Sequence, residues 1–133
     1  MPNYTHTNLK DIEDVAVRFG QSPDLEARFA AGPLELERSG LSYQRMAPGF
    51  RMFSHRHHEQ EEIYVVLSGG GQIKLDDDDV ELRPLDVVRI APETGRAVEA
   101  GPEGLELIAF GAPRGAEDSV VKDVERLPDP WGG

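Results

Sequence analysis

The chain has 133 residues, no cysteine and a formal net charge of −11. A chain of this length forms one domain with its own core, and the absence of cysteine excludes disulfides, zinc-thiolate sites and cysteine nucleophiles. The acidic charge argues against nucleic acid as a partner, because phosphate binding requires a basic face.

The N-terminus lacks a basic segment followed by an apolar one, and no apolar run in the sequence is long enough to span a membrane. We therefore expect a cytoplasmic protein with no membrane partner. Asn8 is suited to cap a short helical turn that extends through Asp14, because its side chain can accept a bond from a free backbone N–H group. Residues 22–29 fit either a second helical turn or a strand with alternate apolar residues on one face.

Residues 1–40 are predicted to form an N-terminal extension with edge strands. Leu34 and Leu36 alternate with glutamates, which favours a half-buried strand. An open sheet edge needs cover, so we expect this strand to provide the contact of a homodimer. Residues 41–47 form the next predicted strand, which a Pro-Gly pair ends.

From residue 50 onward, short apolar segments follow one another at intervals of about ten residues, with turn signals between them. This spacing predicts an all-β sandwich or barrel. The predicted strands are residues 50–57, 62–67, 72–75, 80–82, 86–91, 96–100 and 105–110. Glycines at 69–71 and 101–104 are expected to form turns between strands.

The strand at 62–67 is apolar on both alternating faces, so we expect it to be central and covered on each side. The C-terminal tail, residues 112–133, contains the apolar residues Val120, Val121 and Val124. We expect this tail to lie over the barrel or over a partner subunit.

Three residues near the middle of the chain form a candidate metal site. His55 and His57 are two positions apart, so their side chains project from the same face of an extended strand. Glu62 opens the following strand. Two imidazoles and a carboxylate from adjacent strands suit a divalent transition metal such as Fe, Mn, Ni or Zn. The alternative is a site without metal, in which the imidazoles form hydrogen bonds to Glu62 and to each other.

The spacing of these residues resembles the first conserved motif of the cupin family, Gly-x5-His-x-His-x4-Glu-x6-Gly. That motif is matched at Gly49, His55, His57, Glu62 and Gly69. The resemblance covers residues 41–111, which we take as the barrel domain. It implies a cupin double-stranded β-helix, a jelly-roll-like all-β barrel that here follows short N-terminal helical turns. It also implies a homodimer.

The second cupin motif, Gly-x5-Pro-x-Gly-x2-His-x3-Asn, is clear only in its apolar strand. Leu85 and Glu93 stand where the family has glycine. Arg96 stands where metal-binding cupins have the histidine that completes a site of three histidines and one glutamate. A guanidinium carries a permanent charge and has no lone pair for a metal. Arg96 is therefore expected to neutralise Glu62 in place of metal, to bind a ligand carboxylate or phosphate, or to extend into solvent.

Three further residues are candidates for the pocket. Tyr64 lies on the same strand face as Glu62 and is predicted to bind ligand, although an ordinary core position fits it as well. His58 and Glu61 lie on the loop between the ligand strands and are candidate catalytic residues for proton transfer. A solvated loop position is the alternative for His58.

These features lead to one functional hypothesis and two alternatives. The first is a cupin that binds a small, anionic molecule in its barrel. A divalent metal held by His55, His57 and Glu62 would orient this molecule, with assistance from Arg96. The alternatives are a metal-free ligand-binding or sensing module and a metal-free sugar isomerase or epimerase. The sequence leaves open whether the protein is an enzyme.

Overall fold

The computed structural model describes residues 3–114 and 123–132, which form an antiparallel eight-stranded sheet preceded by a short 3-10 helix. The elements are η1 (Leu9–Asp11), β1 (Leu25–Phe29), β2 (Gly40–Met46), β3 (His55–His57), β4 (Glu61–Leu75), β5 (Asp78–Leu82), β6 (Val87–Ile90), β7 (Arg96–Ala112) and β8 (Val124–Arg126). The predicted all-β fold with short N-terminal helical turns is confirmed. No helix among the described residues is long and apolar enough to cross a membrane.

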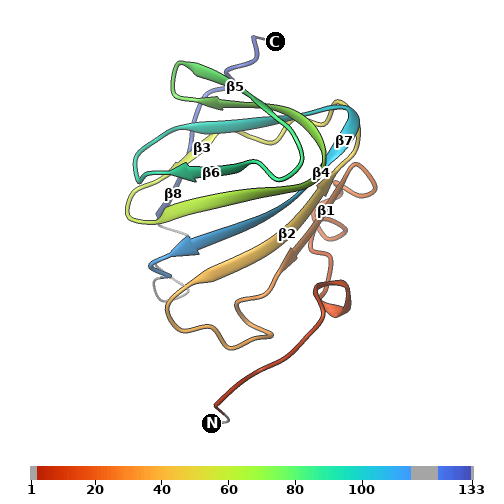
Figure 1. Cartoon of the computed structure of the whole chain (residues 1–133), viewed down its shortest axis with the longest axis vertical. Helices are drawn as coiled ribbons and strands as arrows, with labels where there is room; N and C mark the ends of the chain where they lie inside the picture. The colour runs from red at the N-terminus through yellow and green to blue at the C-terminus, as the bar shows by residue number, and fades with distance from the viewer. Residues whose placement is uncertain (1–2, 115–122, 133) are drawn as a thin grey trace.

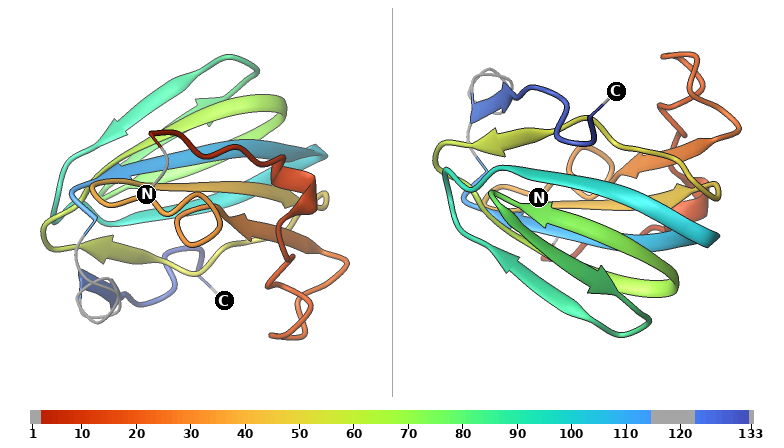
Figure 2. Two further views of the ribbon diagram at one scale, coloured as in Figure 1. Left: turned by 90° about the horizontal axis from the view of Figure 1, so that it is seen from below. Right: turned by 90° about the horizontal axis from the view of Figure 1, so that it is seen from above.

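The sheet curls into a barrel-like shape (Figure 1). Strands β3 and β8 lie on one side of the molecule and β5 and β6 on the other, with β2 and β7 between them (Figure 2). The two longest strands, β4 and β7, pair from Glu61 opposite Ala112 to Leu75 opposite Arg96. Strand β4 also pairs with β5 and β6, and β7 also pairs with β2 and β3. Most of β4 and part of β7 therefore have a neighbouring strand on both sides.

The glycine-rich segments at 69–71 and 101–104 do not end strands, so the predicted turns at these positions are wrong. The register of β4 on β7 shifts here instead, and both strands continue through bulges. Gly69 has a φ of +71°, and a Cβ atom on it would lie 2.1 Å from the carbonyl oxygen of Gly104. Only glycine allows this close approach, so the glycines permit a bend inside a continuous strand.

Strand β4 separates the interior of the barrel from its outer surface. Tyr64 and Val66 face inward and are 3% and 0% exposed. Ile63 and Val65 are only half-buried, and Leu67 is 38% exposed. The prediction that this strand is covered on both sides is therefore wrong for the outer face, because an antiparallel sheet can leave one face toward solvent.

The N-terminal extension forms part of the sheet. Asn8 caps η1 as predicted, because its side chain accepts a hydrogen bond from the backbone N–H of Lys10, but η1 ends at Asp11 rather than at Asp14. The segment at 22–29, for which the sequence allowed a helix or a strand, contains β1, which pairs with β2. The tertiary pairing with β2 thus decides between two local structures that the residue pattern fits equally well.

The predicted strand around Leu34 and Leu36 is wrong. Residues 31–35 form a turn, in which the backbone N–H of Leu34 donates to the carbonyl of Ala30 and that of Leu36 to the carbonyl of Ala31. Both leucines are half-buried there, so their alternation with glutamates reflects burial in a turn. The strand that was expected to form the homodimer contact is therefore absent at this point. The homodimer itself stays a prediction.

The C-terminal segment contributes β8, which pairs with β3 so that His57 lies opposite Val124. Of the predicted strand at 50–57, only residues 55–57 form a strand, β3. Val120 and Val121, which were expected to cover the barrel, lie outside the described residues. The pairing of β3 with β8 brings the end of the chain beside the two histidines.

Two departures from the second cupin motif coincide with unusual backbone geometry. Leu85 and Glu93 stand at positions that the motif assigns to glycine, and their φ angles are +71° and +73°. In this left-handed region the Cβ atom of an L-residue is crowded, at a cost of about 1–2 kcal/mol. The chain therefore keeps a backbone typical of glycine while carrying larger side chains.

Replacing Leu85 with glycine is expected to raise the free energy of unfolding by about 0.5–1 kcal/mol. The Leu85 side chain is 80% exposed, so the change relieves backbone strain and loses little burial. Urea unfolding measures the effect. Val87→Gly is the matched control, because Val87 is 64% exposed on the strand β6 and should lose about 1 kcal/mol. If Leu85→Gly and Val87→Gly both lowered the free energy of unfolding, the proposed backbone strain at Leu85 would be contradicted.

A buried carboxylate ties the N-terminal segment to the sheet. The Glu26 side chain is 8% exposed and forms ion pairs with Lys10, Arg28 and Arg45 at 2.7, 2.7 and 2.9 Å. Burial by itself would raise the pKa of Glu26. The hydrogen bonds from the three cations outweigh burial and lower the pKa to about 2.

The Glu26 network should make stability fall in acid. The pKa of Glu26 is about 2 in the folded protein against 4.5 in the absence of these interactions, so the unfolded chain binds the proton first. The stabilisation is therefore complete above pH 4.5 and is lost as the pH falls toward 2. Glu26→Gln should lower the free energy of unfolding at neutral pH by about 2 kcal/mol and flatten this part of the pH profile.

Urea unfolding from neutral pH down to pH 2 measures both effects. Asp79→Asn is the control, because Asp79 is 58% exposed in its pair with Lys74 and should change the unfolding free energy by less than about 0.5 kcal/mol. A Glu26→Gln variant with the acid profile of the wild type would show that the network does not stabilise the fold.

Candidate metal and ligand site

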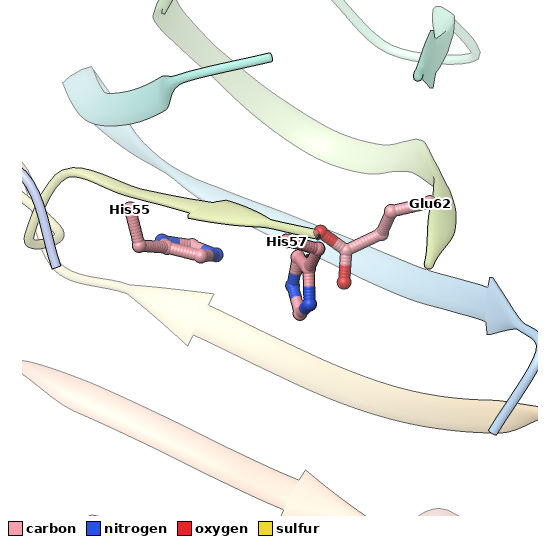
Figure 3. A group of neighbouring side chains, drawn as sticks. All are labelled: His55, His57 and Glu62. Atoms are coloured by element: carbon pink, nitrogen blue, oxygen red, sulfur yellow. Dashed lines mark ion pairs between the residues drawn. The ribbon is translucent and has the colours of Figure 1, made fainter. Parts of the chain in front are cut away.

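The three predicted metal ligands come together inside the barrel. His55 and His57 are the first and last residues of β3, and Glu62 is the second residue of β4. Both histidines are 7% exposed. The candidate ligand atoms of the three residues lie within 4.8 Å of one another. Figure 3 shows the Glu62 carboxylate pointing toward the His57 ring, with His55 beside them.

Hydrogen bonds orient the two imidazoles. The Nδ1 atom of His57 lies 2.9 Å from Oδ2 of Asp123, and that of His55 lies 3.4 Å from the carbonyl oxygen of Phe53. Both partners are acceptors, so we assign the proton of each neutral ring to Nδ1, which leaves the Nε2 lone pairs free. The Nε2 atom of His57 lies 3.7 Å from Oε1 of Glu62. This is the arrangement of histidines that ligate metals.

His55 is uncharged at neutral pH. Burial is the main cause, and together with the charge of Arg96 it lowers the pKa of His55 to about 4. The neighbouring His57 also lowers this pKa, and the carbonyl of Phe53 opposes the shift. A neutral imidazole is the form that can offer a lone pair to a metal ion.

Arg96 lies behind this cluster and is completely buried. It is the first residue of β7, opposite His55 of β3 and Leu75 of β4. Its exposed fraction is 0%, and its Nη1 group donates to Oε1 of Glu62 at 3.4 Å. Its Nε and Nη2 groups have no hydrogen-bond partner among the described residues. The alternative in which Arg96 extends into solvent is therefore wrong, and its charge instead compensates that of Glu62.

A cavity of about 410 Å³ lies in front of the cluster. His55, His57, Glu62 and Tyr64 line one part of it, whereas Arg96 is not among the lining residues. Burial, and next the charge of Glu62, raise the pKa of Tyr64 well above its usual value. The other walls are mostly apolar side chains from the N-terminal segment, β1 and residues 50–53. Apolar walls with a few convergent polar groups are typical of a small-molecule site.

His58 and Glu61, the predicted residues for proton transfer, are not among the residues that line the cavity. The His58 ring lies between Glu93 and Glu125, with nitrogen–oxygen distances of 3.0 and 3.4 Å. The Glu61 side chain is 51% exposed and pairs with Arg89 at 3.5 Å. The structure thus places the His58 ring beside two carboxylates and Glu61 in an ion pair with Arg89, both away from the ligand cluster, and a catalytic role for them stays a prediction.

Asp123 is a site residue that the sequence did not indicate. Its Oδ2 atom accepts from His57, and its Oδ1 atom accepts the backbone N–H of Glu59 at 2.7 Å. Burial would raise the pKa of Asp123, but these hydrogen bonds outweigh burial and lower it. Asp123 is 66 residues from His57 along the chain. No local pattern connects the two residues, and only the pairing of β8 with β3 brings them together.

Replacing Asp123 with alanine is expected to release the His57 ring from the tautomer with its proton on Nδ1, because the acceptor for that proton is removed. Correlation of ring 1H and 15N signals by NMR in the metal-free protein measures the tautomer. The control is Glu125→Gln, because the Glu125 carboxylate pairs with Arg56 at 2.9 Å and does not contact His57. An unchanged His57 tautomer in Asp123→Ala would contradict the assigned role.

Comparison with protein families identifies the central part of the chain. A family model for the cupin domain matches residues 42–110. An uncharacterised protein of Methanocaldococcus jannaschii is 35% identical over 51 residues, which are 38% of this chain and 41% of that protein. The match therefore spans less than half the length of this curated relative.

Solved structures resemble most of the described fold. A cupin protein of Bacteroides fragilis is 25% identical, with a TM-score of 0.70 over 87% of this chain and 89% of that chain. Streptomyces PAC13 with uridine is 16% identical, with a TM-score of 0.70 over 96% and 92%. KdgF from Halomonas sp. is 17% identical, with a TM-score of 0.63 over 74% and 87%. These last two likenesses show a shared fold alone.

The family match covers more than half of the chain. It includes His55, His57 and Glu62, which converge in the barrel, and Arg96, which lies behind them. The match to the family and the curled antiparallel sheet agree with the spacing of the first motif. The chain belongs to the cupin domain family.

Proposed function

We propose that the protein binds a divalent metal ion through His55, His57 and Glu62, and that the cavity beside them binds a small organic molecule. The observation that carries this proposal is the convergence of the two imidazoles and the carboxylate to within 4.8 Å inside the barrel. Burial of such groups costs free energy unless they are paired or coordinate a metal. Arg96 already compensates the charge of Glu62, and the proposed ion would bind the free Nε2 lone pairs of the two buried imidazoles.

The donor set fits a transition metal. Two imidazole nitrogens and a carboxylate oxygen are suitable ligands for Fe, Mn, Ni or Zn, and the chain contains no cysteine thiolate. A metal with only three protein ligands also keeps positions for a water molecule or an organic ligand. When bound, the ion would supply Lewis acidity toward a carbonyl or carboxylate group. The hydrogen bond from His57 to Asp123 keeps one imidazole in the orientation that such a site needs.

The buried charges favour an anionic ligand. Glu62 and Arg96 compensate each other, and Asp123 adds one negative charge on the other side of His57. A dication would therefore leave an excess of positive charge in a poorly solvated interior. A monoanionic ligand would remove this excess. Arg96 would assist through its charge rather than by contact, because it does not line the cavity.

A metal-free ligand-binding module is the second candidate, and the contact between Arg96 and Glu62 favours it. Arg96 stands at the position of the fourth ligand in the second cupin motif. It donates to Oε1 of Glu62, the same oxygen that lies 3.7 Å from Nε2 of His57. In this alternative the ion pair compensates Glu62 without a metal, and the cavity binds its ligand through shape and apolar contact. Streptomyces PAC13 with uridine supports small-molecule binding in this fold.

Calorimetric titration with Zn²⁺ tests the metal proposal. The wild type should bind one ion per chain, and Glu62→Gln should weaken binding by about 100-fold or more, because a neutral amide is a poor ligand. Arg96→His should tighten binding by about tenfold or more, because it removes a positive charge and adds an imidazole. Glu61→Gln is the matched control, since this exposed neighbouring carboxylate lies outside the cavity and should leave affinity unchanged.

The protein for this titration is purified without a polyhistidine tag, which would itself bind zinc. Absence of zinc binding by the wild type, together with a site in Arg96→His, would contradict the metal proposal. That result would support the metal-free module, in which Arg96 has replaced the ion. Equal affinities for Glu62→Gln and the wild type would show that zinc binds elsewhere.

A further inference from the structure

Four of the chain's five phenylalanines line the cavity. Three of them, Phe19, Phe29 and Phe53, are exposed to solvent by 72%, 51% and 44%. Exposed apolar side chains that gather in one place mark a surface that binds an apolar group. Phe110, the fifth, is 41% exposed and is not among the lining residues. The phenylalanine side chains are therefore concentrated at the cavity.

Small side chains on the sheet create the space beside these phenylalanines. Phe29 of β1 lies in one row with Ser42 of β2, Ala109 of β7 and Tyr64 of β4. In the neighbouring row, a glycine of β7 lies opposite Glu62, and the Gln60 side chain packs over this glycine. Because the middle strands carry only serine and alanine beside Phe29, the sheet leaves a hollow between the phenylalanines and the polar cluster.

The hollow has two chemically different parts. Apolar side chains form one, and His55, His57 and Glu62 form the other. A depth that reaches buried histidines suits a small molecule better than a segment of another protein, which would need a long exposed groove. A ligand with an apolar body and a charged end matches both parts.

We propose that the ligand is an amphipathic monocarboxylate, with an alkyl or ring body against the phenylalanines and its carboxylate toward the histidines. This inference rests on the proposed metal site, which would supply the positive charge for the carboxylate. A sugar fits less well, because apolar side chains outnumber polar ones on the cavity wall and would leave several of its hydroxyl groups without partners. Of the polar groups on the wall, Gln44 and Ser42 already bond to each other at 3.3 Å.

A matched pair of ligands tests the chemical class. Cyclohexanecarboxylate and glucuronate both have a six-membered ring and one carboxylate, and they differ mainly in the ring oxygen and the hydroxyl groups. Calorimetry on the zinc-loaded protein should show cyclohexanecarboxylate binding at least about tenfold more tightly. Equal affinities, or tighter binding of glucuronate, would overturn the proposal.

A chain-length series tests the apolar wall. From acetate through butanoate to hexanoate, affinity should rise by about fourfold for each added methylene group, as expected for burial of apolar surface. Phe53→Ser should weaken hexanoate binding by about three- to tenfold, whereas Phe110→Ser is the control and should leave it unchanged. A flat series would overturn the proposal. The proposal would also be overturned if Phe53→Ser changed the molecular mass measured by light scattering but left the affinity for hexanoate unchanged. The exposed phenylalanines would then bind a second copy of the chain.

The same titrations without zinc separate this inference from the proposed function. Loss of carboxylate binding without the ion supports both. A series that rises equally with and without zinc supports the amphipathic ligand and contradicts the metal as its partner. In that case Arg114, a cation of the cavity wall, would hold the carboxylate, and Arg114→Gln would weaken hexanoate binding. A series that is flat even when zinc binds overturns the ligand class and leaves the metal site intact.

Discussion

The antiparallel pairing of β4 with β7 is the constraint on which the site depends. These strands run side by side from Glu61 opposite Ala112 to Leu75 opposite Arg96, and each is held on its other side as well. Glu62 and Tyr64 of β4 and Arg96 of β7 are positioned by this one ladder. The bulges at the glycines bend both strands without interrupting them, so that one pair of strands contributes to both the wall and the interior of the barrel.

Inside the barrel, the arrangement of charged side chains follows from the need to compensate the charge of Arg96. A fully buried guanidinium cannot lose its charge, and it therefore requires a nearby anion. Glu62 provides that anion at 3.4 Å, and it also faces His57. The same carboxylate thus belongs to an ion pair and to a candidate metal site. Arg96 and the proposed metal ion would compete for this carboxylate, so both a metal centre and a metal-free pocket are compatible with the structure. An anionic ligand would favour the metal centre.

The two ends of the chain complete the site from outside the conserved barrel motif. Strand β8 places Asp123 against His57, and the N-terminal segment supplies apolar wall for the cavity. The Glu26 network, with Lys10 before β1 and Arg45 on β2, holds this N-terminal wall against the sheet. The proposed ligand would therefore contact apolar residues of the N-terminal segment as well as the polar cluster that the first motif supplies.

Local spacing was sufficient to predict the fold class and the group of His55, His57 and Glu62. Two histidines two positions apart share a face of any extended segment, and the next strand begins a few residues later, so these contacts follow from short-range geometry. The same local reasoning failed at the glycines of β4 and β7. A glycine that permits a bulge has the same sequence signature as one that forms a turn, and only the opposing strand distinguishes them.

Tertiary structure alone decided the burial of Arg96, the partnership of Asp123 with His57 and the aromatic cavity. Asp123 is 66 residues from His57, and Arg96 is 34 residues from Glu62. Contacts over such separations depend on strand order and register, which composition and periodicity do not encode. The sequence by itself thus determined which side chains the barrel motif carries, and the pairing of distant strands determined which charges, hydrogen bonds and apolar walls surround them.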